Sequence, residues 1–164
     1  MAYPHLTPPD AGELVQIGGF GTRYKVLSGA TGGSVAIVEH TLQPGLLGAP
    51  HHRHSREDEI SYVLQGELTV EIEGEISNVP AGGVMVKPRG RFHTFWNAGA
   101  QTVQFLEVIS PGGFEEYFRE LAGIILSDAP PDMGAVASLV ARYGMEFNLE
   151  SLPGLMQQHG LRLG

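Results

Sequence analysis

The sequence predicts an all-β fold, an antiparallel sandwich or barrel, followed by a helical C-terminal segment. Glycine accounts for 23 of the 164 residues and proline for 11, which favours many short strands joined by turns over long helices. Alternating or β-branched runs of strand length recur from about residue 13 to residue 109, at the spacing typical of sandwiches and barrels. Beyond Pro111 the apolar residues change to helical spacing.

The expected strands are separated by Gly or Pro. In residues 67–73, ELTVEIE, apolar and polar side chains alternate as in a strand with one buried face. Residues 34–42, SVAIVEHTL, are a second strong candidate because they are rich in β-branched residues. The remaining candidates are ELVQIGG, FGTRYKVL, EISYVLQ, EISNV, GVMVKP, FHTFWN and TVQFLEVI.

Two helices are expected after the strands. In GGFEEYFRELAGIIL the apolar residues recur at helical spacing with charged residues opposite, and PPDMGAVASLVARYG also gathers apolar residues on one face. Pro131 suits a first helical turn, and Gly144 suits a left-handed C-terminal cap. The helices are expected on the outside of the barrel or against a second subunit. Plain core helices of a monomer are an equally open alternative.

One domain is the default for a chain of this length. Three prolines within the first nine residues argue against regular structure there. We therefore expect an N-terminal arm over residues 1–12, a β-barrel over 13–112 and a C-terminal helical extension over 113–164, whose end could be extended.

The composition excludes several classes of function. The formal net charge is −8, and an acidic chain without a basic patch is a poor candidate for nucleic-acid binding. Cysteine is absent, which excludes disulfides, thiolate metal sites and a cysteine nucleophile, and fits a reducing compartment. Because we find neither a signal peptide nor an apolar run long enough to span a bilayer, we expect a cytoplasmic protein without a membrane partner.

The stretch PHHRHSREDEISYVLQG has the composition of a metal site. If its histidines lie on a strand, His52 and His54 point to one side and His51 to the other. Two imidazoles at positions i and i+2 can hold one metal ion. Glu59 opens the next strand and could supply an oxygen ligand, and His93, on a later strand, could supply the fourth ligand.

Three neutral imidazoles and one carboxylate suit Fe, Mn, Co, Ni, Cu or Zn and are a poor set for calcium. Four protein ligands leave one or two positions open on a five- or six-coordinate ion, as catalysis requires. We therefore expect one divalent transition metal per chain. The isolated His5, His40 and His159 are expected to be surface or hydrogen-bonded polar residues.

Two stretches show fixed spacings among His, Glu, Gly and Pro. The first reads H-x-H, four residues, E, six residues, G, and comprises His52, His54, Glu59 and Gly66. The second reads G, five residues, P, x, G, two residues, H, three residues, N, and comprises Gly82, Pro88, Gly90, His93 and Asn97. These spacings resemble the paired motifs of the cupin superfamily. The first departs from the family pattern where Leu46 replaces the usual opening glycine.

The resemblance implies a double-stranded antiparallel β-helix, the jelly-roll barrel of cupins, with His52, His54, Glu59 and His93 as metal ligands. Glu59 alone has both required gaps, so Glu57 and Asp58 are expected at the surface or behind the ligands. The match covers about residues 45–97 by motif and about 34–109 by strand pattern.

Three phrases, REDEISYVLQGEL, KPRGRFHTFWNAG and SPGGFEEYFRELA, resemble single-barrel bacterial cupins described as quercetin 2,3-dioxygenase-like. The resemblance implies a metal-dependent dioxygenase acting on a small aromatic or enol-type compound. Glu59 could also take a proton from the substrate, for which its pKa would have to rise towards the working pH. Phe95, Phe105 and Met85 are candidates for the substrate pocket, with packing inside the barrel as the alternative for each.

Two other functions stay open. One is a non-catalytic cupin that binds or senses a small molecule, although the sequence shows no DNA-binding segment; the other is a metal-dependent isomerase or decarboxylase. We also expect a homodimer, because antiparallel barrels have edge strands to cover and the helical tail could reach across a two-fold axis.

Overall fold

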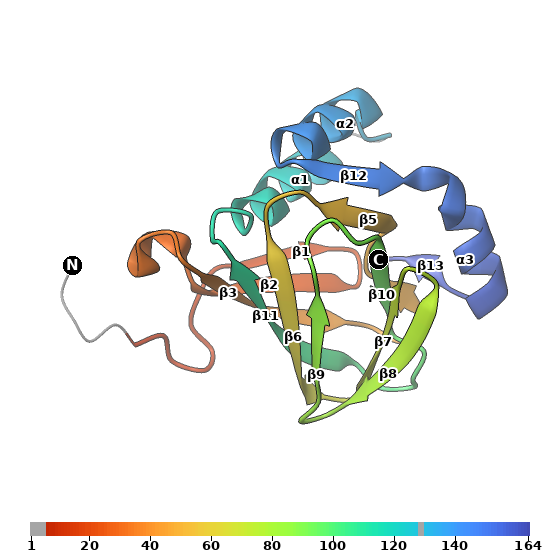
Figure 1. The fold of residues 1–164 in the computed structure, drawn as a ribbon, viewed down its shortest axis with the longest axis horizontal. Coiled ribbons are helices and arrows are strands. Elements are labelled where there is room, and N and C mark those ends of the chain that lie inside the picture. Colours follow the sequence, from red (N-terminus) through yellow and green to blue (C-terminus); the bar gives the residue numbers. More distant parts are fainter. Residues whose placement is uncertain (1–5, 128–129) are drawn as a thin grey trace.

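The computed structural model describes residues 6–127 and 130–164, so His5 lies outside the described residues. Within these ranges, two sheets enclose a common interior, and the C-terminal helices cover one side of it (Figure 1). The predicted all-β fold with a helical C-terminal segment is confirmed. Residues 6–12 contain no regular secondary structure.

The first sheet has six strands among the described residues, in the order β1-β2-β3-β11-β6-β9, with all neighbours antiparallel. Its strands are β1 (Leu14–Ile17), β2 (Phe20–Val26), β3 (Ala36–Leu42), β6 (Asp58–Gln65), β9 (Val84–Lys87) and β11 (Val103–Ser110). Strand β9 therefore forms one edge of this sheet.

The second sheet follows the order β12-β5-β10-β4-β13, and β7 pairs with both β10 and β8. Its pairs are antiparallel except for β13 and β4. Its strands are β4 (Leu46–Leu47), β5 (His51–His54), β7 (Glu67–Ile72), β8 (Glu75–Pro80), β10 (His93–Trp96), β12 (Met145–Asn148) and β13 (Arg162–Leu163). The C-terminal segment thus adds two strands to the barrel wall. Strand β13 fits the expectation that the end of the chain could be extended, whereas β12 was not expected.

Strands β3 and β11 carry the alternation that the sequence predicts. Every second residue is buried along each of them, because successive side chains of a strand point to opposite faces of the sheet. Most of the buried positions are apolar, but two are not. His40 on β3 and Glu107 on β11 are 2% and 1% exposed, so both titratable groups lie in the barrel interior.

Two apolar clusters stabilise the barrel. One fills the end of the barrel around Leu68, Val70 and Phe105, and the other joins the barrel to the helices through residues such as Ile109 and Leu139. Burying a side chain of this size contributes about 1.5–3 kcal/mol relative to leaving it exposed. The helices therefore pack on the barrel of their own chain.

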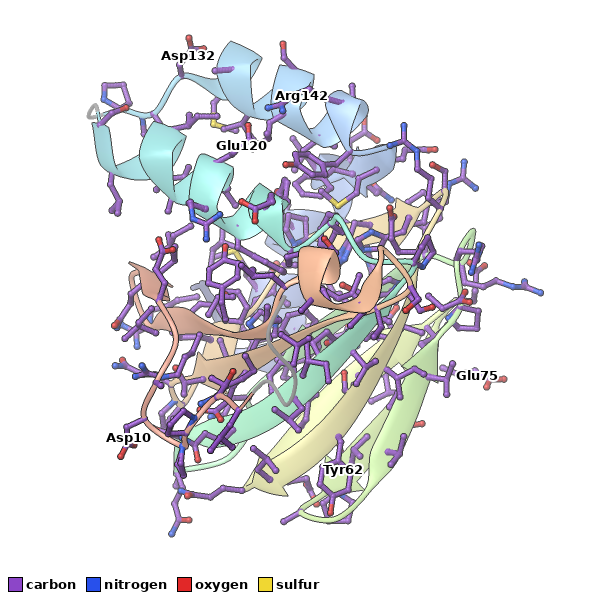
Figure 2. The ribbon with its side chains drawn as sticks, turned by 90° about the vertical axis from the view of Figure 1, so that its left-hand side faces the viewer. Asp10, Tyr62, Glu75, Glu120, Asp132 and Arg142 are labelled. Atoms are coloured by element: carbon purple, nitrogen blue, oxygen red, sulfur yellow. The ribbon has the colours of Figure 1, made fainter. Side chains whose placement is uncertain are left out.

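The helical segment differs from the predicted pair in number and in one boundary. The described residues contain three α-helices and two short 3-10 helices: α1 (Glu116–Ser127), α2 (Met133–Arg142), α3 (Leu152–His159), η1 (Ser28–Thr31) and η2 (Leu149–Ser151). Figure 2 shows Glu120 of α1 and Arg142 of α2 between these helices, where they form an ion pair. No helix in the described part of the chain combines the length and apolarity needed to cross a bilayer.

The placement of Pro131 in a first helical turn is wrong. Helix α2 begins at Met133, because the Asp132 side chain accepts hydrogen bonds from the amides of Gly134 and Ala135 and so caps the helix. The left-handed conformation expected of Gly144 is confirmed by its φ of 68°. The third helix, α3, escaped prediction because its eight residues include a proline and a glycine and show only a weak apolar stripe.

Candidate metal centre

Four buried side chains from three strands converge inside the barrel. Strand β5 supplies His52 and His54, strand β6 supplies Glu59 and strand β10 supplies His93. One nitrogen or oxygen atom from each lies within 4.8 Å of all the others. The structure thus brings together the same four residues that the paired motifs single out, and this cluster could bind a metal ion.

The strand register explains the convergence. His93 on β10 is paired with His52 on β5, and their ring centroids are 4.3 Å apart. His54 lies two residues further along β5 on the same face, 5.7 Å from the His93 ring. Glu59 belongs to the other sheet, where it is paired with Ile109. The cluster therefore forms where the two sheets approach each other.

Backbone carbonyls orient two of the imidazoles. His52 Nδ1 donates a hydrogen bond to the carbonyl oxygen of Pro50 at 2.8 Å, and His93 Nδ1 donates to that of Arg91 at 3.1 Å. A carbonyl can only accept, so Nδ1 carries the proton in each ring and Nε2 keeps its lone pair. This is the arrangement that fixes the tautomer of metal-binding histidines.

His54 supplies the test of whether a metal fits. Both of its ring nitrogens are sealed from solvent without a hydrogen-bond partner, as is Glu57 Oε2. Nε2 lies 3.5 Å from Glu59 Oε2, and Nδ1 lies 3.6 Å from Glu57 Oε2. An unsatisfied buried polar atom costs about 1–3 kcal/mol. A cation at the centre of the cluster would satisfy Nε2, so the donor set fits a divalent transition metal.

The electrostatics keep the cluster in its ligand form. Burial lowers the pKa of His52 well below its ordinary value, with His93 and His54 adding to the effect, and burial also lowers the pKa of His93. Burial alone would raise the pKa of Glu59, but the Lys87 ammonium and the neighbouring histidines hold it well below its usual range. Neutral imidazoles and an ionised carboxylate are the forms that bind metal.

A buried lysine next to the cluster was missed in the sequence. Lys87 is 1% exposed, and its Nζ lies 2.7 Å from Glu107 Oε2 and 3.3 Å from Glu59 Oε2. Ser61 Oγ also donates to Glu107. Burial alone would lower the pKa of Lys87, but the two carboxylates raise it, so the ammonium persists. The alternation within GVMVKP was the available signal, because it places Lys87 on the inward face of β9.

A cavity of about 650 Å³ opens beside the cluster and is bounded by the barrel, α1 and α2. Six aromatic side chains line it: Phe20, Phe95, Phe114, Tyr117, Phe118 and Phe147. Of the three pocket residues expected from the sequence, Phe95 lines this cavity. Phe105 packs edge-on behind Phe95 at 5.7 Å, and Met85 packs against the barrel core. These two residues do not line the cavity.

The polar residues of the cavity wall include Thr22, His40 and Glu107 besides members of the cluster. His40 was expected at the surface or as a hydrogen-bonded polar residue. It is hydrogen-bonded, with its Nδ1 3.1 Å from Thr22 Oγ, and it is buried among aromatic rings. Burial, with a contribution from Lys87, lowers the pKa of His40 to about 3, so its ring is neutral. Its inward position on β3 was again visible in the alternation of SVAIVEHTL.

The remaining described histidines lie outside the cavity. His51 points away from His52, as the alternation predicts, and pairs with Glu71 at 2.9 Å. His159 packs against Trp96, with ring centroids 4.7 Å apart. Asp58 forms an exposed ion pair with Arg89.

Comparisons with known proteins identify the fold. Residues 38–109 match the family model described as Cupin domain (Cupin_2). Among solved structures, KdgF from Halomonas sp. is similar at 24% identity and a TM-score of 0.59, over 66% of this chain and 96% of that one. A predicted oxalate decarboxylase from Thermotoga maritima is similar at 23% identity and a TM-score of 0.61, over 65% and 99%. Such low identities show the fold alone.

One curated relative is named as a transcriptional regulator, not as an enzyme. The chain is 28% identical over 103 residues to the HTH-type transcriptional regulator PuuR of Escherichia coli (strain K12), which is 62% of this chain and 55% of that protein. The chain therefore spans about half the length of the curated relatives it matches. None of these similarities singles out quercetin dioxygenases.

Proposed function

Since residues 38–109 match the family model described as Cupin domain, we propose that the chain is a small cupin and a metal-dependent dioxygenase acting on a small aromatic or enol-type compound. One observation carries the proposal: a cluster of three histidines and one glutamate lies at the wall of a large, mainly aromatic cavity. A metal-ligand set beside an apolar pocket with a few polar groups is the usual form of a catalytic site for an apolar substrate.

In the proposed mechanism, His52, His54, Glu59 and His93 hold the metal. The bound metal would act as a Lewis acid that lowers the pKa of a substrate hydroxyl and orients the substrate beside dioxygen. Glu59 takes the hydroxyl proton. The expected rise in the pKa of Glu59 is wrong, because Lys87 and the histidines keep the pKa of this carboxyl low. Glu59 is therefore a weak base and depends on acidification of the substrate by the metal. The aromatic walls exclude water from the reacting compound.

The cavity wall argues against strongly anionic substrates. No lysine or arginine lines the cavity in the part of the chain that the structure describes, whereas Glu59 and Glu107 do. Apart from the proposed metal, the wall offers a sugar phosphate or a small dicarboxylate no cationic or bidentate donor. The chemistry of the wall therefore favours dioxygenation of an apolar compound over the isomerase and decarboxylase alternatives.

Oxygen uptake tests the proposal. A dioxygenase places both atoms of dioxygen in the organic product and needs no external reductant. The protein is loaded in turn with Fe(II), Mn(II), Co(II), Ni(II) and Cu(II), with a Zn(II) form beside them, and is screened against flavonols and diketones in an oxygen electrode. Uptake should be lost in His93→Ala and kept in His159→Ala, a matched change outside the cavity. Conversion of a substrate without oxygen uptake would instead identify an isomerase or decarboxylase.

A second candidate is a cupin that binds or senses a small molecule without turnover. The similarity to a transcriptional regulator favours this reading. It predicts that the metal-loaded protein binds its ligand in calorimetry and returns it unchanged, with no oxygen consumed. Chemical analysis of the ligand after incubation separates the two candidates.

We also propose that the protein is a homodimer that pairs through the outer face of β6 and β9. Four large apolar side chains on this face are 41–57% exposed: Tyr62, Leu64, Val84 and Val86. Figure 2 shows Tyr62 on the outer face of the sheet, away from the helices. Because β9 is an edge strand, a second copy could cover both this face and its free backbone groups. The cytoplasmic location and the domain boundaries stay predictions from the sequence.

A further inference from the structure

We propose that His40 determines the specificity of the cavity, with its Nε2 accepting a hydrogen bond from a hydroxyl group of a two-ring aromatic ligand. The inference deepens the proposed function, because it names the class of compound that the cavity selects. It rests on the part of the cavity wall around His40, not on any reaction at the cluster.

The hydrogen bonds of His40 define which nitrogen faces the ligand. Nδ1 lies 3.1 Å from Thr22 Oγ and 3.4 Å from the carbonyl oxygen of Gly21. The carbonyl can only accept, so the Nδ1 proton points to this side and Nε2 carries the lone pair. Among the described residues no group donates to Nε2, and His40 lines the cavity. A neutral imidazole held in this way presents an acceptor to the cavity.

The surroundings of His40 favour a flat ligand. Phe20 stacks on the imidazole with ring centroids 4.8 Å apart, Phe118 meets it edge-on at 5.0 Å, and the Phe105 ring is tilted against it at 5.1 Å. Within such a cluster a phenylalanine would fill the space without burying a polar nitrogen. The histidine instead presents an acceptor nitrogen to the cavity, where water or a ligand hydroxyl can donate to it. A ligand hydroxyl is the donor that this wall lacks.

The distance to the metal cluster sets the size of the ligand. Along β11, His40 is paired with Phe105 and Glu59 with Ile109. These positions are four residues apart, roughly 13 Å at about 3.3 Å per residue. The inward-facing Glu107 lies between them. This backbone spacing and the cavity volume of about 650 Å³ leave room for two fused or linked rings with a hydroxyl at the His40 end.

The hydrogen-bonding groups of the cavity wall narrow the class of ligand further. His40 Nε2 is an acceptor, and no described lysine or arginine lines the cavity. A ligand group that donates a hydrogen bond is therefore favoured next to Nε2, whereas a carboxylate or phosphate there would place a second acceptor against it. A phenol can donate a hydrogen bond to His40 Nε2, whereas its methyl ether has no hydrogen to donate.

The test compares 2-naphthol with 2-methoxynaphthalene by titration calorimetry on the full-length chain stripped of metal with a chelator. The wild type should bind the naphthol about tenfold more tightly, as expected for one hydrogen bond to an otherwise unpaired acceptor. His40→Phe should remove this preference and leave the affinity for the ether within about twofold. His159→Phe, the same change outside the cavity, should keep the preference for naphthol over the ether.

Equal affinities in the wild type, or a preference that survives in folded His40→Phe, would overturn the inference. A second measurement does not depend on the variant: in long-range ¹H–¹⁵N spectra of the wild type, naphthol should shift the His40 Nε2 resonance and the ether should not. Because these experiments use metal-free protein, their outcome is independent of oxygen uptake. A protein that shows the naphthol preference without oxygen uptake would keep this inference and lose the dioxygenase proposal.

Discussion

The ammonium group of Lys87 lies 2.7 Å from Glu107 Oε2 in the barrel interior, where both side chains are almost completely buried. Removing Lys87 takes the counter-charge from this buried carboxylate, which typically costs up to about 3–5 kcal/mol. Burial raises the pKa of Glu107 to about 7, so proton uptake by this carboxyl limits the loss. Lys87→Met should therefore lower the free energy of unfolding by up to this amount in urea titrations. The double variant Lys87→Met/Glu107→Met should recover at least half of the loss.

The exposed ion pair of Arg89 and Asp58 provides the comparison for the buried pair. Breaking a surface pair costs about 1 kcal/mol or less, so Arg89→Met should barely change stability. If Lys87→Met were no more destabilising than Arg89→Met, the buried pair would not have the structural role assigned to it.

Acid should destabilise the wild type partly through His40. The pKa of this ring is about 3 in the folded protein and about 6.5 in an unfolded chain. The unfolded state therefore binds more protons below pH 6.5, and stability falls as the pH drops from there towards 3. At about 1.4 kcal/mol per pH unit, His40 accounts for a loss of roughly 2 kcal/mol between pH 7 and pH 5.

His40→Phe isolates this contribution in urea titrations of metal-free protein at the two pH values. Between pH 7 and pH 5, the free energy of unfolding of the variant should fall by about 2 kcal/mol less than that of the wild type, because the other histidines act equally in both proteins. Equal losses in the two proteins would mean that His40 titrates normally in the folded state.

The proposed dimer contact is tested by introducing charge on β9. Val84→Glu and Val86→Glu place carboxylates on the exposed apolar face, so each should shift the solution mass from dimer to monomer in light scattering. Leu126→Glu on α1, where the native side chain is 65% exposed, should leave the mass unchanged. A wild type that is monomeric at micromolar concentration would refute the contact.

Much of the fold was predictable because alternation along a strand is a local signal. The nine strand runs identified in the sequence correspond to β1, β2, β3 and β6 through β11. The strands without such a run, β4, β12 and β13, are two to four residues long and owe their pairing to distant parts of the chain. Such pairing leaves little trace in a short stretch of sequence.

The residues of the site also fall into those that a local sequence signal reveals and those that depend on contacts between distant strands. His52, His54, Glu59 and His93 could be singled out because their spacing along the chain is characteristic. Lys87, Glu107 and His40 could not, because what makes them tolerable inside the barrel is a partner from another strand. Glu107 on β11 pairs with Lys87 on β9, and Thr22 on β2 holds His40. Alternation placed these residues inward, but only the tertiary contacts explain why the buried charge and the buried ring are stable.

The central claim is that the four-residue cluster binds one metal ion, and elemental analysis tests it most directly. Protein purified without chelator should carry about one equivalent of a divalent transition metal. His52→Ala and His93→Ala should lose the metal, while His159→Ala should retain it. A wild type that binds no metal, even after reconstitution with Fe(II), Mn(II), Ni(II) and Zn(II), would contradict the claim and leave a barrel that recognises its ligand through the cavity wall alone.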